Sequence, residues 1–371
     1  MVSLDGVSAG TWVALVEGAA AQCAGGTELE VYRSAENEIR SLPARPVFRT
    51  PYSVRAKVSF SDGSTSCSNV ADHSFSPLDG IASLAAGSGF TCGLTSSGTV
   101  KCWGRNESGE LGDGTTTDRG SPTEISGLTG VIAIAAGNLH ACALLGAGTV
   151  ECWGWNVYGQ VGDGTTTSRL SPTPVPGLSG VVAISAAFSN TCAVLGTGGV
   201  KCWGSNSYGQ IGDGTTTSRP SPTAVSGLSG ADSVTVGSDH VCARLGTGDV
   251  ECWGSNSYGQ IGDGTTTDCH SPTSVSGLSG VDSVAAGDSH TCAMLADGTV
   301  KCWGRNVSGQ VGDGTTTDRA SPTPVPGLSG IVEIGAGHDF TCSRSGAGAL
   351  FCWGNNREGE LDDGTTTSRS S

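Results

Sequence analysis

The cysteines are the residues whose type and spacing most clearly predict chemistry. Twelve of the fifteen form six pairs, and the members of each pair are ten residues apart. The pairs are Cys92 with Cys102, Cys142 with Cys152, Cys192 with Cys202, Cys242 with Cys252, Cys292 with Cys302, and Cys342 with Cys352. Two thiols at this spacing could form a disulfide, stay reduced as small core residues, or ligate zinc. Zinc is the weakest of these interpretations, because each pair would need two more ligands and no histidine follows at ligand spacing.

The sequence around each pair predicts a β-hairpin, and its register bears on the choice between a disulfide and two reduced thiols. In the first copy the turn centres on Ser97, so Cys92 lies directly opposite Cys102 and Leu94 lies opposite Val100. Directly opposed residues of an antiparallel pair bring their Cβ atoms to roughly 4.5–5.5 Å, near disulfide reach. The register therefore favours six disulfides, although reduced thiols stay open as an alternative.

The three remaining cysteines carry a second set of expectations. Cys23 and Cys67 are predicted to bridge the N-terminal region, and Cys269 is left over where other copies carry arginine. Paired cysteines imply an oxidising compartment. We therefore expect an extracellular or cell-surface protein. Because the first residues show no signal peptide, this placement requires a truncated N-terminus.

Other residues with chemical potential fit structural roles better. The recurring Asp-Gly-Thr-Thr-Thr segment, first seen at 113–117, offers one or two carboxylates, whereas calcium takes six to eight oxygens. No Ser/His/Asp triad and no phosphate-binding Gly-Lys-Ser/Thr loop is present. We expect no catalytic residue, no metal and no cofactor, and hence a protein that is not an enzyme.

A repeat of 50 residues organises most of the chain and predicts the elements that position these residues. Its six copies begin at residues 81, 131, 181, 231, 281 and 331, and the sixth is nine residues short. Each copy reads as four short strands joined by glycine-rich turns, the pattern of a β-propeller blade. The fold class is therefore all-β, and the repeated tryptophan (Trp103 in copy one) is expected to pack between blades.

The ends of the repeat array leave two interpretations open. Residues 72–80 place Phe75, Leu78 and Gly80 where copy one has Ile125, Leu128 and Gly130, so this segment could supply the missing strand and close a six-bladed ring within 71–371. The alternative is a seven-bladed ring whose last copy is missing. Residues 1–70 do not share the repeat and resemble part of a fibronectin type III or immunoglobulin-like β-sandwich.

Composition excludes several classes of function. The net charge is −15, and the chain has no basic cluster that would attract a phosphate backbone, so nucleic acid is not expected as a partner. No apolar run approaches the roughly 18 residues of a membrane span, so membrane insertion is not expected either.

Copy two carries the signature of a known family. Residues 137–144, 148–154, Asn156 and 159–162 resemble the repeat of the regulator of chromosome condensation family. The resemblance implies a β-propeller, usually with seven blades, and the cysteine pairs are similar to those of its bacterial, secreted or surface-exposed branch. A secreted bacterial β-lactamase inhibitor of this architecture binds its target through loops on one face.

The copies differ most just before the first cysteine and just after the Trp-Gly. Both clusters are predicted in loops, and their aromatic and arginine side chains are types that binding interfaces favour. We expect a non-enzymatic binding module for a protein or glycan; the alternative is a regulator like the family's exchange factor for a small GTPase. The predicted contact residues are Arg105, His140, Trp155, Tyr158, Phe188, Tyr208, His240, Tyr258, His290 and Arg305.

Overall fold

The computed structural model describes residues 14–16, 30–32, 57–59, 65–67 and 80–371. The chain divides into two units, Gly80–Leu361 with Thr366–Ser371, and Met1–Asp79 with Asp362–Thr365. In the described part of the chain, no helix is long and apolar enough to cross a membrane.

Six consecutive antiparallel sheets form the six blades of a β-propeller, five with four strands and the sixth with three. The first strands are β5 (Ile81–Ala86), β9 (Val131–Ala136), β13 (Val181–Ala187), β17 (Ala231–Val236), β21 (Val281–Ala286) and β25 (Ile331–Ala336). The second strands are β6 (Phe90–Thr95), β10 (His140–Leu145), β14 (Asn190–Leu195), β18 (His240–Leu245), β22 (His290–Leu295) and β26 (Phe340–Ser345). The third strands are β7 (Val100–Gly104), β11 (Val150–Gly154), β15 (Val200–Gly204), β19 (Val250–Gly254), β23 (Val300–Gly304) and β27 (Leu350–Gly354). The outer strands are β8 (Arg119–Glu124), β12 (Arg169–Pro174), β16 (Arg219–Ala224), β20 (Cys269–Ser274) and β24 (Arg319–Pro324).

The central hairpin of each blade has the predicted register. In blade one, Cys92 pairs with Cys102 and Leu94 pairs with Val100 across β6 and β7. The same register pairs the two cysteines directly in each of the other five blades. A shift of one residue would turn one of the two thiols to the opposite face of the sheet.

All six predicted repeat disulfides are formed, one in each blade. They join Cys92 to Cys102, Cys142 to Cys152, Cys192 to Cys202, Cys242 to Cys252, Cys292 to Cys302, and Cys342 to Cys352. This confirms the disulfide interpretation over reduced thiols and zinc. Cys269 is free, and Cys23 lies outside the described residues, so its bond to Cys67 stays a prediction.

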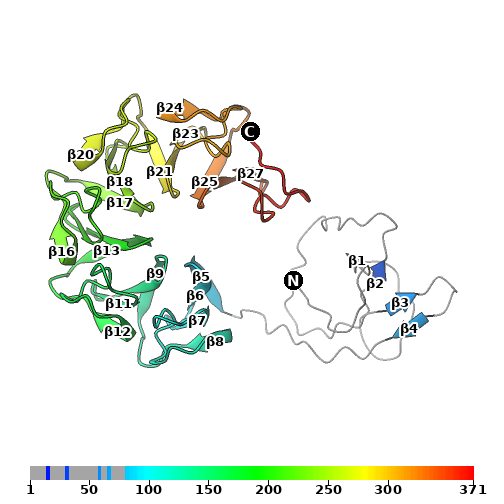
Figure 1. Cartoon of the computed structure of the whole chain (residues 1–371), viewed down its shortest axis with the longest axis horizontal. Helices are drawn as coiled ribbons and strands as arrows, with labels where there is room; N and C mark the ends of the chain where they lie inside the picture. Colours follow the sequence, from blue (N-terminus) through cyan, green and yellow to red (C-terminus); the bar gives the residue numbers. More distant parts are fainter. Residues whose placement is uncertain (1–13, 17–29, 33–56, 60–64, 68–79) are drawn as a thin grey trace. The chain divides into compact units, whose positions relative to one another are not determined.

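The hydrophobic core lies between successive blades rather than within each sheet. The first strands contact their neighbours from β5 through to β25, and Figure 1 shows the blades following one another with these strands turned inward. Between blades one and two, Phe90, Leu94 and Val100 of one blade pack with Ala143 and Trp153 of the next. The tryptophans of blades two to six are buried in this way, as predicted, whereas Trp103 of blade one is only partly buried.

The N-terminal region contributes four short described strands. β1 (Ala14–Val16) pairs with β2 (Glu30–Tyr32), and β3 (Lys57–Ser59) pairs with β4 (Thr65–Cys67), both antiparallel. The rest of the predicted β-sandwich lies outside the described residues and stays a prediction. The same holds for ring closure by residues 72–80, of which the structure describes only Gly80.

Candidate functional site

Two loops of each blade lie at the same end of the blade. One joins the first strand to the second, and the other follows the third strand. A backbone hydrogen bond ties them together: the Trp155 N–H donates to the Leu139 carbonyl at 2.8 Å. Equivalent bonds in the other blades are donated by Arg105, Ser205, Ser255, Arg305 and Asn355. We call this end the loop face, formed by residues 87–90 and 105–110 of copy one and their equivalents.

A buried asparagine fixes the longer loop. In blade two, Asn156 Oδ1 accepts the Val161 N–H at 2.8 Å, and Asn156 Nδ2 donates to the Thr165 carbonyl at 3.1 Å. Asp163 completes the frame, because its Oδ1 accepts the Thr165 N–H and its Oδ2 accepts Arg169 Nε. Burial alone would raise the pKa of Asp163, but hydrogen bonds from Thr165 and Arg169 hold it below its usual range. Both carboxylate oxygens are occupied by protein donors, which supports a structural role over a calcium site.

Three tyrosines stand at the same loop position on three successive blades. Tyr158, Tyr208 and Tyr258 keep 43%, 43% and 41% of their surfaces exposed. Each backbone N–H donates to a glutamine side chain two residues later, as Tyr158 does to Gln160 Oε1 at 3.0 Å. The glutamines are almost fully buried. The tyrosine rings are therefore presented to solvent from a rigid backbone.

Two further aromatic residues from the prediction also reach the loop face. The rings of Trp155 and Tyr158 meet edge to face, with centroids 5.5 Å apart. Phe188 is 46% exposed and has a φ of 42°, which side chains with a Cβ rarely adopt. Strained backbone positions cluster at functional sites, and the contact role of Phe188 stays a prediction.

The predicted arginine Arg305 belongs to a polar network that sequence reasoning missed. Arg305 Nη1 donates to Asp339 Oδ1 at 3.2 Å, and the guanidinium lies 5.5 Å from the centre of the Tyr258 ring. His338 bridges two acids, with Nε2 2.8 Å from Asp288 Oδ2 and Nδ1 3.4 Å from Asp339 Oδ2. The signal was present in the sequence, because residues 88 and 89 differ from copy to copy, but from these two positions the prediction took only Phe188.

Arg105, the other predicted arginine, lies on blade one. Its side chain is 43% exposed and forms an ion pair with Glu107. Its Nε also lies 3.9 Å from the buried Glu110 carboxylate. Arg105 and Arg305 are therefore both at the loop face and both engaged with acids.

The three predicted histidines lie elsewhere, which corrects the expectation that they contact a partner. His140, His240 and His290 are fully buried between blades. His140 Nε2 lies 2.9 Å from Thr191 Oγ1 of the next blade, and that hydroxyl donates to the Gln160 carbonyl. The histidine Nε2 must therefore carry the proton, and Nδ1 has no partner.

Burial sets the charge of these histidines. It lowers the pKa of His140 and of His240 to about 4. Burial lowers the pKa of His290 to about 3, with contributions from His240 and His338. All three are neutral near pH 7 and serve as links between blades.

Cys269 stands where other blades have an arginine that stabilises this loop, and this difference gives a testable prediction. In four other blades, the arginine at this position donates to the loop aspartate, with Nη2 2.5–2.6 Å from Oδ2. Blade four has only a thiol 3.9 Å from Asp263 Oδ2. Cys269→Arg is expected to raise the unfolding free energy by about 1 kcal/mol, a value for a partly exposed ion pair. Chemical denaturation measures this, and Cys269→Ala, which adds no guanidinium, should show no such gain; equal gains would contradict the prediction.

Within residues 80–371, no group of three or more histidine, cysteine, aspartate or glutamate side chains is placed to hold a metal ion. The loop face thus combines exposed aromatic rings on blades two to four with Arg105 and its acidic partners on blade one and a charged network that extends to blade six. Such a surface can bind another molecule by apolar contact and hydrogen bonds.

Solved structures share this architecture. Human WBSCR16 is 24% identical, with 71% of this chain and 72% of that chain aligned at a TM-score of 0.64. Yeast RCC1 (Prp20) bound to Kap60 is 21% identical, with 78% of this chain and 73% of that chain aligned at a TM-score of 0.68. A crystal structure of Prp20p from Saccharomyces cerevisiae is 21% identical, with 78% of this chain and 75% of that chain aligned at a TM-score of 0.70. These similarities show the fold. Comparison with curated proteins gives no match.

Family models identify the repeat itself. One model of the regulator of chromosome condensation (RCC1) repeat matches residues 81–110, 131–160, 181–210, 231–260, 281–310 and 331–360. A second model of the same repeat matches residues 97–144, 147–194, 197–244, 247–294 and 297–343, which is more than half of the chain. With six blades that each carry the repeat, the chain belongs to the regulator of chromosome condensation (RCC1) repeat family.

Proposed function

We propose that this propeller is a non-enzymatic, extracellular or cell-surface module that binds a protein partner through its loop face. The observation that carries the proposal is the row formed by Tyr158, Tyr208 and Tyr258. These rings occupy one loop position on three successive blades and are each more than 40% exposed. Tyrosine gives a large contact area at a low cost in conformational entropy, and its hydroxyl can pair with a partner's polar groups.

A protein partner is favoured over a glycan by what the relatives bind. The structures of yeast Prp20p concern its complex with Kap60 and its binding to Gsp1p and histones. The six repeat disulfides support the extracellular placement, because such bonds persist in oxidising compartments.

The test compares three forms of the chain as immobilised baits. The loop-face variant carries Tyr158→Ser, Tyr208→Ser and Tyr258→Ser. Serine fits this loop, because Ser308 at the same position makes the same bond from its N–H to Gln310. We expect it to lose a protein that the wild-type chain retains, since interface tyrosines often contribute 2 kcal/mol or more, roughly thirtyfold in affinity.

The control variant carries Ile132→Asp and Val182→Asp at the other end of the blades. Both positions are exposed at the start of β9 and β13, and copies four and five have Asp232 and Asp282 there. This variant should retain the partner as the wild-type chain does. Equal retention by all three forms, or loss with the control alone, contradicts the loop-face proposal. Extracts of secreted and of cytosolic proteins are tested separately, and a partner found only in the cytosolic extract contradicts the extracellular placement.

A further inference from the structure

One arginine of the loop face is held by side chains from the blades on both sides of it. Arg305 of blade five donates from Nη1 to both carboxylate oxygens of Asp339 of blade six, at 3.2 and 3.3 Å. Its guanidinium lies 5.5 Å from the centre of the Tyr258 ring of blade four. Gln310 fixes the carboxylate, because its Nε2 donates to Asp339 Oδ1 at 2.8 Å. A carboxylate beside an aromatic ring suits a guanidinium, which pairs with acids through a planar fork and stacks on rings.

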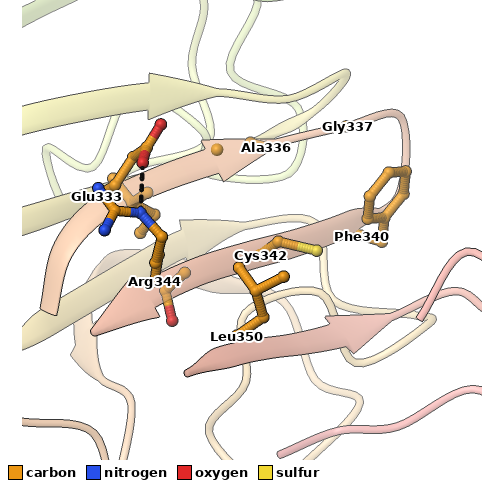
Figure 2. Close-up of a pocket in the computed structure, with 10 residues that line it drawn as sticks. Glu333, Ala336, Gly337, Phe340, Cys342, Arg344 and Leu350 are labelled. Carbon is orange, nitrogen blue, oxygen red and sulfur yellow. Dashed lines mark hydrogen bonds and ion pairs between the residues drawn. The ribbon is translucent and has the colours of Figure 1, made fainter. Parts of the chain in front are cut away.

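Arg344 shows how this arrangement differs from a surface ion pair. Arg344 Nε lies 2.8 Å from Glu333 Oε2 on the neighbouring strand, beside a cavity of about 350 Å³ lined by blade six alone (Figure 2). These two side chains are 45% and 65% exposed, whereas the side chain of Asp339 is only 15% exposed. Water competes less for a charge that is partly buried. The surroundings of Arg305 are therefore a guanidinium site built from three blades.

The repeat places the same components two copies earlier, with one difference. Tyr158 of blade two and Asp239 of blade four stand at the positions of the tyrosine and the aspartate that hold the arginine. Gln210 Nε2 donates to Asp239 Oδ1 at 3.1 Å, as the later glutamine does to its aspartate. The arginine position itself is Ser205, whose side chain ends at a hydroxyl. We call Tyr158, Ser205 and Asp239 the Ser205 site.

The carboxylate of the Ser205 site has acids rather than bases around it. In the described part of the chain, no basic side chain forms an ion pair with Asp239. Burial raises the pKa of Asp239, and the negative charges of Asp288 and Asp268 raise it further. A cation beside this carboxylate offsets the repulsion from both acids.

The aromatic ring of the Ser205 site is also accessible. Tyr158 is 43% exposed, close to the 41% of Tyr258, which lies beside Arg305. The Trp155 ring meets Tyr158 edge to face, and such a contact covers at most one face of the tyrosine ring. A cation from outside the chain can therefore reach this ring as well as the carboxylate.

We propose that the Ser205 site binds an arginine side chain of the protein partner, in the way that the chain holds its own Arg305. The partner's guanidinium lies over Tyr158 and pairs with Asp239. This inference rests on the proposed function, because it names a side chain that the loop face selects in its partner. Lysine fits less well, since its ammonium is a strongly hydrated point charge without a planar fork.

The probe for the test is the capped tripeptide acetyl-Gly-Arg-Gly-amide, titrated into the full chain and followed by saturation-transfer NMR. We expect binding that Ser205→Arg weakens about tenfold or more, because the introduced guanidinium takes the site. This variant suits the fold, since copies one and five have Arg105 and Arg305 at this position. Asp239→Asn keeps the acceptor for Gln210 but removes the charge, and it should also weaken binding about tenfold. The same tripeptide with lysine in place of arginine should bind less tightly than the arginine form.

Two further variants are matched controls. Tyr158→Ser should weaken peptide binding about threefold, the size of a cation–π contact. Tyr258→Ser removes a ring at the same loop position that already contacts Arg305, so it should leave peptide binding unchanged. Ser257→Arg adds the same charge to the loop face as Ser205→Arg, at an exposed position where copy six has Arg357. It should bind the peptide as the wild-type chain does.

The proposal is overturned if Ser205→Arg binds the peptide as tightly as the wild-type chain, or if Ser257→Arg weakens binding equally. Equal affinity for the lysine tripeptide overturns the assignment to arginine. An immobilised Ser205→Arg bait separates this inference from the proposed function. If that bait retains the partner as the wild-type chain does, the partner's arginine is not the occupant, and the tyrosine row can still bind. If no bait retains any protein, the proposed function fails, whereas peptide binding that Ser205→Arg removes still supports the arginine site.

Discussion

Replacing the three buried histidines together with their threonine partners is expected to remove most of the loss in unfolding free energy between about pH 6.5 and about pH 4. The pKa values of about 4, 4 and 3 lie below the 6.5 of an unfolded chain, so the unfolded state binds more protons as the pH falls below 6.5. The wild-type unfolding free energy must therefore decrease from about pH 6.5 downward. At about pH 5 the loss is about 2 kcal/mol for each histidine.

The chain itself supplies the replacement. In copy one the histidine position is Phe90, and it packs with Ala141 of the next blade in the same core cluster. The matched variant therefore carries His→Phe at 140, 240 and 290 and Thr→Ala at 191, 291 and 341. Urea unfolding between about pH 7 and pH 4 measures both proteins. Every carboxylate is common to the two chains, so parallel pH profiles would contradict the prediction.

The fold could be predicted because the repeat fixes local geometry. The turn at Ser97 sets the hairpin register, and the register alone brings Cys92 opposite Cys102. The same turn position in each later copy brings the other five cysteine pairs together in the same way. Hydrophobic periodicity, turn residues and cysteine spacing thus all predicted the same hairpin in each blade, and the structure has this hairpin.

The histidines show what the same reasoning could not reach. They vary from copy to copy, and variation was taken as exposure. The structure shows instead that each histidine contacts the residue 51 positions later, as His140 contacts Thr191. Where the first residue of the pair is Asn190 instead of histidine, the residue 51 positions later is Val241 instead of threonine. Compensated contacts between blades vary together. Comparison of pairs 51 residues apart, rather than single positions, was the signal that would have found them.

For the loop that carries the tyrosines, the sequence predicted the exposed positions but not the hydrogen bonds that hold the loop. Tyr158 and its equivalents were predicted at a loop surface and lie there. The frame beneath them depends on Asn156, whose side chain closes a loop through residues up to eleven positions away. No local pattern specifies the bonds to the Thr165 and Thr167 carbonyls, because only the folded loop determines where these carbonyls lie.

Placing a Cβ against the indole of a tryptophan that is buried between two blades is the second change with a large expected effect. Gly162→Ala is expected to lower the unfolding free energy by about 3 kcal/mol, combining positive-φ strain with overpacking. The new Cβ would lie 2.5 Å from Trp203 Nε1, and Gly162 has a φ of 81°. Displacing the indole also breaks its bond to the Gln160 carbonyl and leaves a buried N–H without a partner. Chemical denaturation gives the free energy.

A second glycine of the same copy isolates the steric part. Gly177 has a φ of 75°, and a Cβ there would meet nothing within 4 Å. Gly177→Ala should therefore cost only the backbone strain, about 1 kcal/mol. If both variants lose the same free energy, the indole has moved aside without cost, and its contact with Gly162 does not exclude a Cβ.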